Sequence, residues 1–355
     1  MSTRVLVVDD TVVFRRVISE ALAGIAGVEV AGTASNGRTA LARIQSLQPD
    51  LVTLDIEMPE MNGIDVLRAM KASGAAAGVI ALSALTVRGG ELTMRALELG
   101  AFDFLAKPET GTPDENLDLL RAGLLPLIRA YERRRHTAAP LELPVKPAPA
   151  ATRPARVPKR SGMPLVVIGV STGGPAALAK LIPALPRDLE APVLIVQHMP
   201  ALFTRPLAAN LAAKSKIPVK EAEDGEPARP GCAYIAPGGR QMKLVAGPQG
   251  EVLVRVNDDP PVGNCRPSVD YLFRSVALNF PGRAVAAILT GMGNDGAAGL
   301  GMLKRGGCYS IAQDESSCVV FGMPREAILA GVVDTVEPLD KIAGAIVRSI
   351  RETAL

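Results

Sequence analysis

The sequence contains no tryptophan, and aromatic residues make up only 3% of it. This scarcity argues against a nucleic-acid surface that stacks bases on aromatic rings. The four cysteines form no CxxC pair and no cluster with histidine, which argues against disulfides and zinc and favours a cytoplasmic protein. No apolar run reaches membrane-spanning length, and the N-terminal run 5–8 is too short for a signal peptide. We therefore expect neither secretion nor membrane insertion.

The chain also has little excess of either positive or negative charge, since the net charge of its 355 residues is only +3. Between residues 131 and 162 there are eight basic and two acidic side chains, so the rest of the chain is mildly acidic. We interpret this basic stretch as a solvated linker rather than a nucleic-acid or membrane tether. A length of 355 residues predicts two domains rather than one. The composition, with 48% hydrophobic and 21% charged residues, is typical of soluble globular domains.

The first half of the chain alternates short apolar strands with helical stretches. Strands are predicted at 5–8, 28–32, 51–54, 79–82 and 102–105, and the last helix runs from Pro113 to about Arg134. Five such units predict a parallel sheet covered on both faces. Residues 133–163, rich in Pro, Ala and Arg, predict an extended linker between domains 1–132 and 164–355.

The second half again has an α/β pattern. Strands are predicted at 165–170, 193–197, 252–256, 284–289 and 308–312, and helices begin near Pro175, Phe203, Ser268, Ala297 and Pro324. The segment 218–245 reads as short strands and turns that form an antiparallel edge.

An acidic pocket is predicted in the first domain, because functional residues collect at the carboxyl ends of parallel strands. Asp9 and Asp10 end the first strand, Asp55 the third, Ser83 the fourth and Lys107 the fifth. Three carboxylates repel one another unless a cation neutralises them, and oxygen ligands suit Mg²⁺. A carboxylate beside Mg²⁺ and an ammonium group is a plausible phosphoryl acceptor, and a hydroxyl nearby can hydrogen-bond the phosphoryl group.

Residues 4–130 resemble the receiver domain of two-component response regulators. The resemblance is carried by Val7-Val-Asp-Asp10, Leu54-Asp-Ile-Glu-Met-Pro59 with Gly63, Ser83-Ala84, and Phe104 followed by Lys107-Pro108. It implies a flavodoxin-like five-stranded parallel sheet, with Asp55 as the phosphoacceptor and a sensor histidine kinase as the donor. The supporting residues that it implies are Ser83 and Lys107 at the phosphorylation site and Asp9, Asp10, Asp55 and Glu57 for Mg²⁺.

A glycine-rich turn follows the first strand of the second domain. Ser171 lies in Gly169-Val-Ser-Thr-Gly-Gly-Pro175, directly before a helix. The glycines permit a sharp turn that would expose the hydroxyl near helix N-terminal amides. The same loop type also binds phosphates and dinucleotides, so the loop alone favours neither function.

The position of one histidine favours a hydrolase over a phosphate- or dinucleotide-binding domain. Of the two histidines, His136 lies in the arginine-rich stretch, whereas His198 follows the strand 193–197. It is therefore the base available to Ser171, and Asp295 follows the strand 284–289 as the acid that would orient it. The glycines beside Met292 free the backbone to approach a substrate, which makes its N–H an oxyanion-hole candidate.

Residues 164–350 resemble the catalytic domain of the chemotaxis-type protein-glutamate methylesterase/protein-glutamine glutaminase family, known as CheB. Besides these motifs, the resemblance includes Phe203-Thr204, Tyr234-Ile-Ala-Pro-Gly238, Arg266-Pro-Ser-Val-Asp270, Ala312-Gln-Asp-Glu315 and Phe321-Gly-Met-Pro-Arg325. It implies a Rossmann-like three-layer α/β/α hydrolase without a cofactor, in which Ser171 is the nucleophile, His198 the base and Asp295 its orienter. Thr172 and Met292 would line the site.

The substrate also comes only from the resemblance: glutamate methyl esters and glutamines of methyl-accepting chemoreceptors, modified under phosphorylation control during adaptation. Two departures concern substrate contacts, because Arg240 stands where many relatives carry histidine, and Cys265 precedes Arg266.

Two other classes of function remain open. A receiver fused to a nucleotide-binding effector would need an acidic residue for the ribose, and the region after the second strand offers His198 instead. A DNA-binding or other non-catalytic output lacks support, because there is no helix-turn-helix pattern and no basic face in the folded parts.

Overall fold

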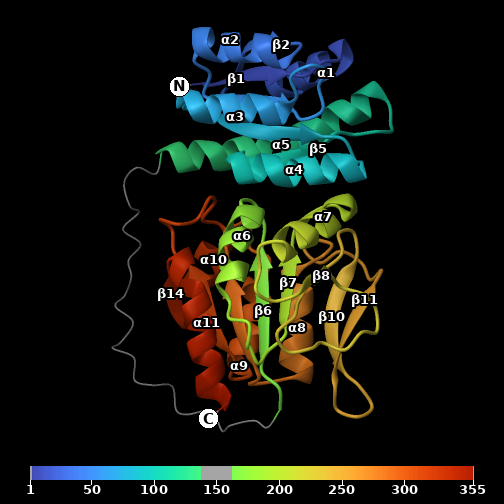
Figure 1. The fold of residues 1–355 in the computed structure, drawn as a ribbon, viewed down its shortest axis with the longest axis vertical. Helices are drawn as coiled ribbons and strands as arrows, with labels where there is room; N and C mark the ends of the chain where they lie inside the picture. Colours follow the sequence, from blue (N-terminus) through green and yellow to red (C-terminus); the bar gives the residue numbers. More distant parts are fainter. Residues whose placement is uncertain (1, 137–161, 355) are drawn as a thin grey trace. The chain divides into compact units, whose positions relative to one another are not determined.

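A computed structural model describes residues 2–136 and 162–354 (Figure 1). The chain divides into two compact units, Met1–Ala139 and Pro140–Leu355. Most of the predicted linker 133–163 lies outside the described residues. In the described part of the chain, no helix is long and apolar enough to cross a membrane.

The first unit is a five-stranded parallel sheet in the order β2-β1-β3-β4-β5, as predicted. The strands are β1 (Thr3–Val8), β2 (Val28–Ala34), β3 (Leu51–Asp55), β4 (Gly78–Ser83) and β5 (Asp103–Ala106). The helices are α1 (Val12–Ala23), α2 (Gly37–Leu47), α3 (Gly63–Ser73), α4 (Val87–Leu99) and α5 (Pro113–His136). Helix α1 packs against α5, while α3 packs against both α2 and α4, so a helical layer covers each face.

Burial explains the apolar sequence of the central strands. All five residues of β3 are buried, and so are Val5, Leu6, Val7 and Val8 of β1. Strands covered by helices on both faces need such unbroken apolar runs. Side-chain caps fix where three helices begin, because Asn36, Asn62 and Thr86 each accept a hydrogen bond from the N–H three residues ahead.

The second unit contains a seven-stranded parallel sheet in the order β14-β13-β12-β6-β7-β9-β8. Its strands are β6 (Leu165–Val170), β7 (Val193–Gln197), β8 (Val219–Glu221), β9 (Ala233–Ile235), β12 (Ala284–Ile288), β13 (Tyr309–Gln313) and β14 (Thr335–Glu337). The helices are α6 (Gly174–Ala184), α7 (Ala201–Ala212), α8 (Val269–Asn279), α9 (Ala297–Arg305), α10 (Met323–Leu329) and α11 (Leu339–Ala354). Helices α8, α9 and α10 pack in sequence, and α6 packs against α7 and α11, which gives the predicted three layers (Figure 1).

One predicted strand lies outside this sheet. Residues 252–256 fall in β11 (Val252–Asn257), which pairs antiparallel with β10 (Gln241–Ala246) and forms a single antiparallel bridge with Pro227. Burial alternates along β11, as expected for a strand with one exposed face, whereas β6 and β12 are buried throughout. Within the expected antiparallel edge 218–245, β8 and β9 instead join the main sheet in parallel, and the antiparallel pairing is that of β10 with β11 and of Pro227 with Leu253.

Chain topology selects one crevice in each sheet. The second unit starts at β6, adds β7, β9 and β8 on one side, and then adds β12, β13 and β14 on the other side. The connections therefore reverse direction between β6 and β12, and in the first unit they reverse between β1 and β3. In open parallel sheets, ligands bind beyond the strand ends at this switch point.

Candidate functional site

Ser171 lies at the switch point of the second sheet, one residue beyond β6. Its N–H donates to Thr290 O (3.0 Å), which ties the turn to the end of the neighbouring strand β12. Gly173 adopts φ 74°, a conformation that favours glycine, and caps α6 at its N-terminus. The half-buried serine is thereby held at the start of a helix, as the sequence predicted.

Glycine is also required where the loop after β12 passes the serine. A Cβ added at Gly291 would lie 2.7 Å from the Cβ of Ser171, closer than two side chains tolerate. The backbone of Gly291 and Met292 therefore comes close to Ser171. Within the described residues, no protein group accepts a hydrogen bond from the Met292 N–H, which leaves this donor available for a ligand.

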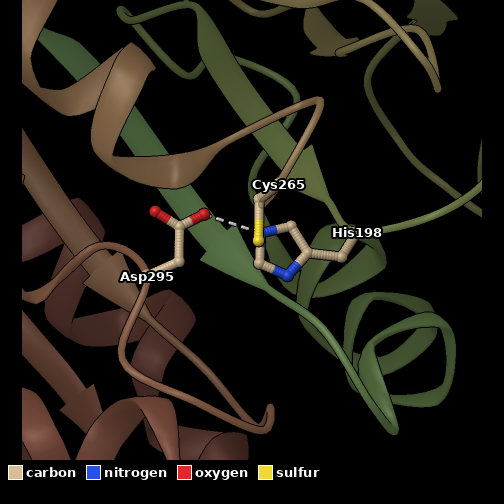
Figure 2. Close-up of side chains that lie close together, drawn as sticks. All are labelled: His198, Cys265 and Asp295. Carbon is tan, nitrogen blue, oxygen red and sulfur yellow. Dashed lines mark hydrogen bonds and ion pairs between the residues drawn. The ribbon is translucent and has the colours of Figure 1, made fainter. Parts of the chain in front are cut away.

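His198 and Asp295 face each other across the same crevice (Figure 2). His198 Nε2 and Asp295 Oδ2 are 2.7 Å apart, and their side chains are 18% and 8% exposed. The His198 N–H donates to Val170 O, so the residue continues the pairing of β7 with β6. The structure thus brings the predicted Ser, His and Asp residues to neighbouring strand ends of one sheet.

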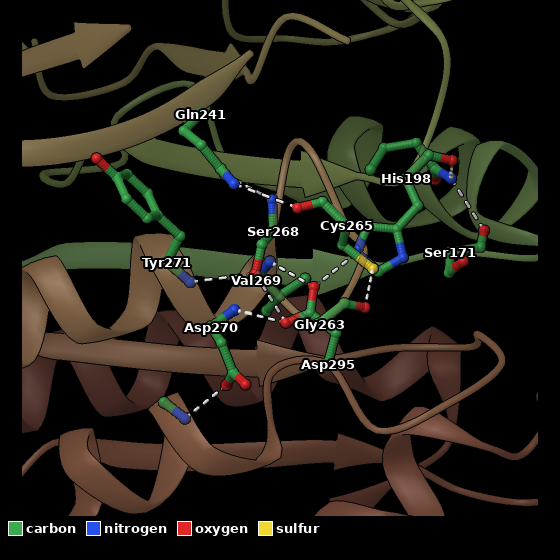
Figure 3. Close-up of polar contacts among 12 residues, drawn as sticks. Ser171, His198, Gln241, Gly263, Cys265, Ser268, Val269, Asp270, Tyr271 and Asp295 are labelled. Atoms are coloured by element: carbon green, nitrogen blue, oxygen red, sulfur yellow. Dashed lines mark hydrogen bonds and ion pairs between the residues drawn. The ribbon is translucent and has the colours of Figure 1, made fainter. Parts of the chain in front are cut away.

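The N-terminus of helix α8 holds Asp295 in place (Figure 3). The carboxylate accepts hydrogen bonds from the Ser268 hydroxyl (2.9 Å), the Val269 N–H (2.8 Å) and the Asp270 N–H (2.9 Å). Burial acts to raise the pKa of Asp295, but the hydrogen bonds from His198 and these amides hold it below its usual value. Asp295 is therefore an ionised, fixed acceptor.

The orientation of the imidazole leaves Nδ1 for the serine. Because Nε2 bonds Asp295, the other ring nitrogen is turned towards the side on which Ser171 lies (Figure 3). Among the described residues, no hydrogen bond joins the Ser171 hydroxyl to His198, and such bonds often tighten only when substrate binds. Burial lowers the pKa of His198, but Asp295 and Cys265 outweigh it and raise the pKa to about 9.

The two departures from the family pattern have different surroundings. Arg240 is half-exposed and pairs with Asp258, with Nε 3.0 Å from Oδ1. Cys265 instead lies at the catalytic crevice, where its sulfur, a His198 ring nitrogen and an Asp295 oxygen lie within 4.8 Å of one another. The predicted absence of a cysteine–histidine cluster is therefore wrong, because folding brings together residues far apart in the sequence.

Thr172 contributes backbone to the same crevice. It is buried, and its carbonyl oxygen accepts a hydrogen bond from the Thr290 hydroxyl (3.0 Å). Within the described residues, no backbone group accepts a hydrogen bond from the Thr172 N–H, so this donor can face a substrate. Met292 is half-buried in the loop opposite.

In the first unit, Lys107 joins two of the predicted carboxylates. Its Nζ lies 2.7 Å from Asp9 Oδ2 and 2.7 Å from Asp55 Oδ2, and all three side chains are buried or nearly so. Burial raises the pKa of Asp55 to about 6, with Asp9 adding to the rise while Lys107 and the Glu57 N–H oppose it. Burial lowers the pKa of Lys107, yet the two aspartates outweigh it and raise that pKa.

The carboxylates of Asp9, Asp10 and Asp55 lie close enough to share a cation, with one oxygen of each within 4.8 Å of the others. Oxygen-only donors at a partly exposed edge fit Mg²⁺. Asp9 also accepts two hydrogen bonds from Thr11, so Asp10 and Asp55 have more free lone pairs. Glu57 offers its backbone, because its side chain turns towards Arg88.

Ser83 is buried at the end of β4, but its hydroxyl currently donates to backbone oxygens. The nearer acceptor is Gly89 O (3.1 Å), in the first turn of α4. The residue is thus at the predicted strand end, with its hydroxyl engaged by helix α4 rather than by Asp55.

The sequence did not predict the residues that position Asp295 and Cys265 through hydrogen bonds. Ser268 was predicted to lie near the start of a helix and within a family motif, but its hydrogen bond to Asp295 was not predicted. Gln241 is buried, accepts from the Ser268 N–H (2.9 Å) and donates to Cys265 O (3.2 Å), and no local pattern in the sequence indicates this.

The fold and the two strand-end sites define a receiver domain joined to an α/β hydrolase-type domain. The family described as CheB methylesterase matches residues 166–346, and the response regulator receiver domain matches residues 5–115. The chain belongs to the CheB methylesterase family and carries an N-terminal receiver domain.

Curated relatives match the chain over nearly its full length. The protein-glutamate methylesterase/protein-glutamine glutaminase of Desulfotalea psychrophila is 50% identical, covering 98% of each chain. The protein of the same name from Bacillus subtilis is 44% identical, covering 98% of this chain and 99% of the relative. The crystal structure of the CheB methylesterase catalytic domain of Thermotoga maritima is similar, with TM-score 0.52 and 43% identity, and covers 53% of this chain and 99% of its own.

Proposed function

We propose that the chain hydrolyses glutamate methyl esters, releasing methanol, and deamidates glutamines on chemoreceptors, and that phosphorylation at Asp55 increases this activity. The observation that carries the proposal is the 2.7 Å bond between His198 and an Asp295 that α8 holds fixed, beside Ser171. The names of the curated relatives support the same activity. The receptor cytoplasmic domain is the substrate, so the protein acts in the cytoplasm.

In this mechanism, Ser171 Oγ attacks the ester or amide carbonyl while His198 Nδ1 takes its proton. Asp295 holds the ring through Nε2 and stabilises the imidazolium that forms. The N–H groups of Met292 and Thr172 donate to the carbonyl oxygen as negative charge develops on it. The imidazolium then protonates the departing methoxide oxygen or amide nitrogen, so that methanol or ammonia leaves. Water next attacks the acyl-serine while His198 takes its proton and then returns a proton to Ser171 Oγ.

In the receiver domain, Asp55 accepts the phosphoryl group from a sensor histidine kinase. Asp10, Asp55 and the Glu57 backbone, beside Asp9, would hold Mg²⁺, which would offset negative charge on the phosphoryl oxygens. Lys107 supplies a second positive charge next to Asp55. The Ser83 hydroxyl is the group that can reach a phosphoryl oxygen once it leaves Gly89 O.

Methanol release from methylated receptor membranes tests the proposal. Ser171→Ala should lower the rate by a factor on the order of 10⁶, as loss of the nucleophile does in other serine hydrolases. Ser316→Ala removes an exposed hydroxyl that bonds Asp314, so it is the matched control and should keep the wild-type rate. A Ser171→Ala rate within tenfold of wild type contradicts the assignment of the nucleophile.

A further inference from the structure

Cys265 adds a soft ligand to a crevice whose chemistry does not need it. The hydrolysis derived above uses Ser171, His198 and Asp295, and gives the thiol no role. Yet its sulfur lies with a His198 nitrogen and an Asp295 oxygen in a cluster whose members are all within 4.8 Å (Figure 2). Thiolate, imidazole and carboxylate together are the ligand set of zinc.

We propose that His198, Cys265 and Asp295 form a zinc-binding site, and that Zn²⁺ bound there inhibits the hydrolase. The binding half of the proposal is independent of the proposed function, whereas the inhibitory half rests on it. Zinc takes such ligands at about 2.0–2.3 Å in a tetrahedron, so neighbouring donor atoms are about 3.3–3.8 Å apart. Donors already within 4.8 Å of one another need to move by only about 1 Å to reach that geometry.

Two of the three ligands are already held by surrounding hydrogen bonds. The Asp295 carboxylate is fixed by Ser268 and two helix amides. The backbone of Cys265 is fixed on both sides, since its N–H donates to Val262 O (2.9 Å) and its carbonyl accepts from Gln241 (3.2 Å). Its sulfur makes a long contact with Gly263 O (3.6 Å) and otherwise faces His198 and Asp295, the other two proposed ligands. Such outer contacts are what orients the ligands in metal sites.

The position of the ion explains why it would inhibit. Zinc would replace the proton that His198 Nε2 shares with Asp295 Oδ2, and the thiol would lose its proton as well. A neutral imidazole bound through Nε2 keeps its single proton on Nδ1. Nδ1 is then a donor and cannot accept the proton of Ser171. A fourth zinc position is open to water.

Cobalt spectroscopy of the full-length chain tests binding without using activity. Metal-free protein in excess Mg²⁺, which occupies the oxygen-only carboxylates of the receiver, is titrated with Co²⁺. We expect a thiolate-to-cobalt absorption band at one equivalent in wild type and in Cys232→Ser, a control at a thiol outside the cluster. The band should be absent in Cys265→Ser and in Cys265→Ala, with melting curves confirming that these variants fold. A wild type without the band, or a band that survives in a folded Cys265 variant, overturns the site.

Zinc titration of methanol release then tests inhibition. Relative to each protein's own metal-free rate, the midpoint should be the same in wild type and Cys232→Ser and at least tenfold higher in Cys265→Ser. Equal midpoints in all three proteins overturn the inhibitory role. A metal-free wild type that releases no methanol counts against the proposed hydrolase and leaves the cobalt result standing.

Discussion

Replacing Ser268 with alanine removes one of the four hydrogen bonds that the Asp295 carboxylate accepts. The same hydroxyl also caps helix α8 by accepting from the Tyr271 N–H (3.3 Å). A hydrogen bond to a charged group contributes about 1.5–3 kcal/mol. Loss of an N-cap costs about 0.5–1 kcal/mol when the cap bond is this long. We therefore expect the free energy of unfolding to fall by about 2–4 kcal/mol.

The activation free energy of the reaction should change less than the free energy of unfolding. The Val269 and Asp270 amides still hold Asp295 in the variant, so we expect a loss of about tenfold in kcat, which corresponds to about 1.4 kcal/mol. The apparent KM should stay constant, because Ser268 is completely buried and does not contact substrate. Urea unfolding and methanol release from methylated receptors measure the two quantities on the same preparations.

Two control variants separate the functions of the hydroxyl. Ser268→Thr keeps it and should retain most of the activity. Ser275→Ala removes a hydroxyl from the same helix that bonds Leu244 and Leu272, so it should lower stability without lowering kcat. Wild-type kcat in a destabilised Ser268→Ala would show that the amides alone position Asp295. Unchanged stability and unchanged kcat together would refute the whole argument.

Three further predictions concern the pH dependence of the hydrolase, the phosphorylation of Asp55 and the effect of the receiver domain on the rate. The pKa of His198 is raised to about 9, so at pH 7 most molecules carry a protonated His198 that cannot act as the base. We therefore expect kcat/KM to rise from pH 7 towards pH 9, and a flat profile would contradict this. Asp55→Asn should abolish Mg²⁺-dependent uptake of phosphate from a small phosphodonor, and stoichiometric uptake would indicate another acceptor. The fragment that begins at Gly162 should hydrolyse receptor esters faster than the unphosphorylated full chain, and phosphorylation should recover most of the difference. A slower fragment would mean that the receiver assists the hydrolase.

The parts of the site that sequence could predict are those that follow buried strands. Asp55 ends the buried strand β3, Ser171 directly follows the apolar strand β6, and Asp295 lies in the loop after the apolar strand β12. Such buried, largely apolar runs mark strands covered on both faces. Parallel strands place their carboxyl ends at one edge, so the sequence also predicts which side chains share a site. The family resemblance is confirmed by the matches to both domains.

What sequence could not predict depends on how distant loops meet. The contact between Cys265 and His198 arises where the loop before α8 crosses the end of β7, and no spacing in the chain encodes it. Of the β10–β11 hairpin, the strand 252–256 was predicted to belong to the main α/β pattern, although its buried and exposed residues alternate as in a strand with one solvent-facing side. Strands β8 and β14 have three residues each, too few for any periodicity to be visible.

Both candidate sites lie at switch points, and the reason is physical in each case. Where the chain reverses its direction of growth, the two connecting loops diverge and leave a crevice that neither helix covers. In one domain the crevice separates β1 from β3 and contains Asp9 and Asp55, and in the other it separates β6 from β12 and contains Ser171 and Asp295. The same topology therefore supports phosphoryl acceptance and acyl transfer, and the side chains at the strand ends decide which one occurs.

The hydrogen bonds of Ser83 suggest how phosphorylation would be transmitted within the receiver domain. Its hydroxyl donates to Gly89 O (3.1 Å), and Thr93 donates to the same oxygen (2.7 Å) one turn later in α4. A phosphoryl group on Asp55 is a stronger acceptor than a backbone carbonyl, so the hydroxyl would turn from α4 towards it. Gly89 O would then keep one of its two side-chain donors, and the first turn of α4 would be free to shift. Phosphorylation would therefore alter the end of α4 as a direct result of satisfying the new charge.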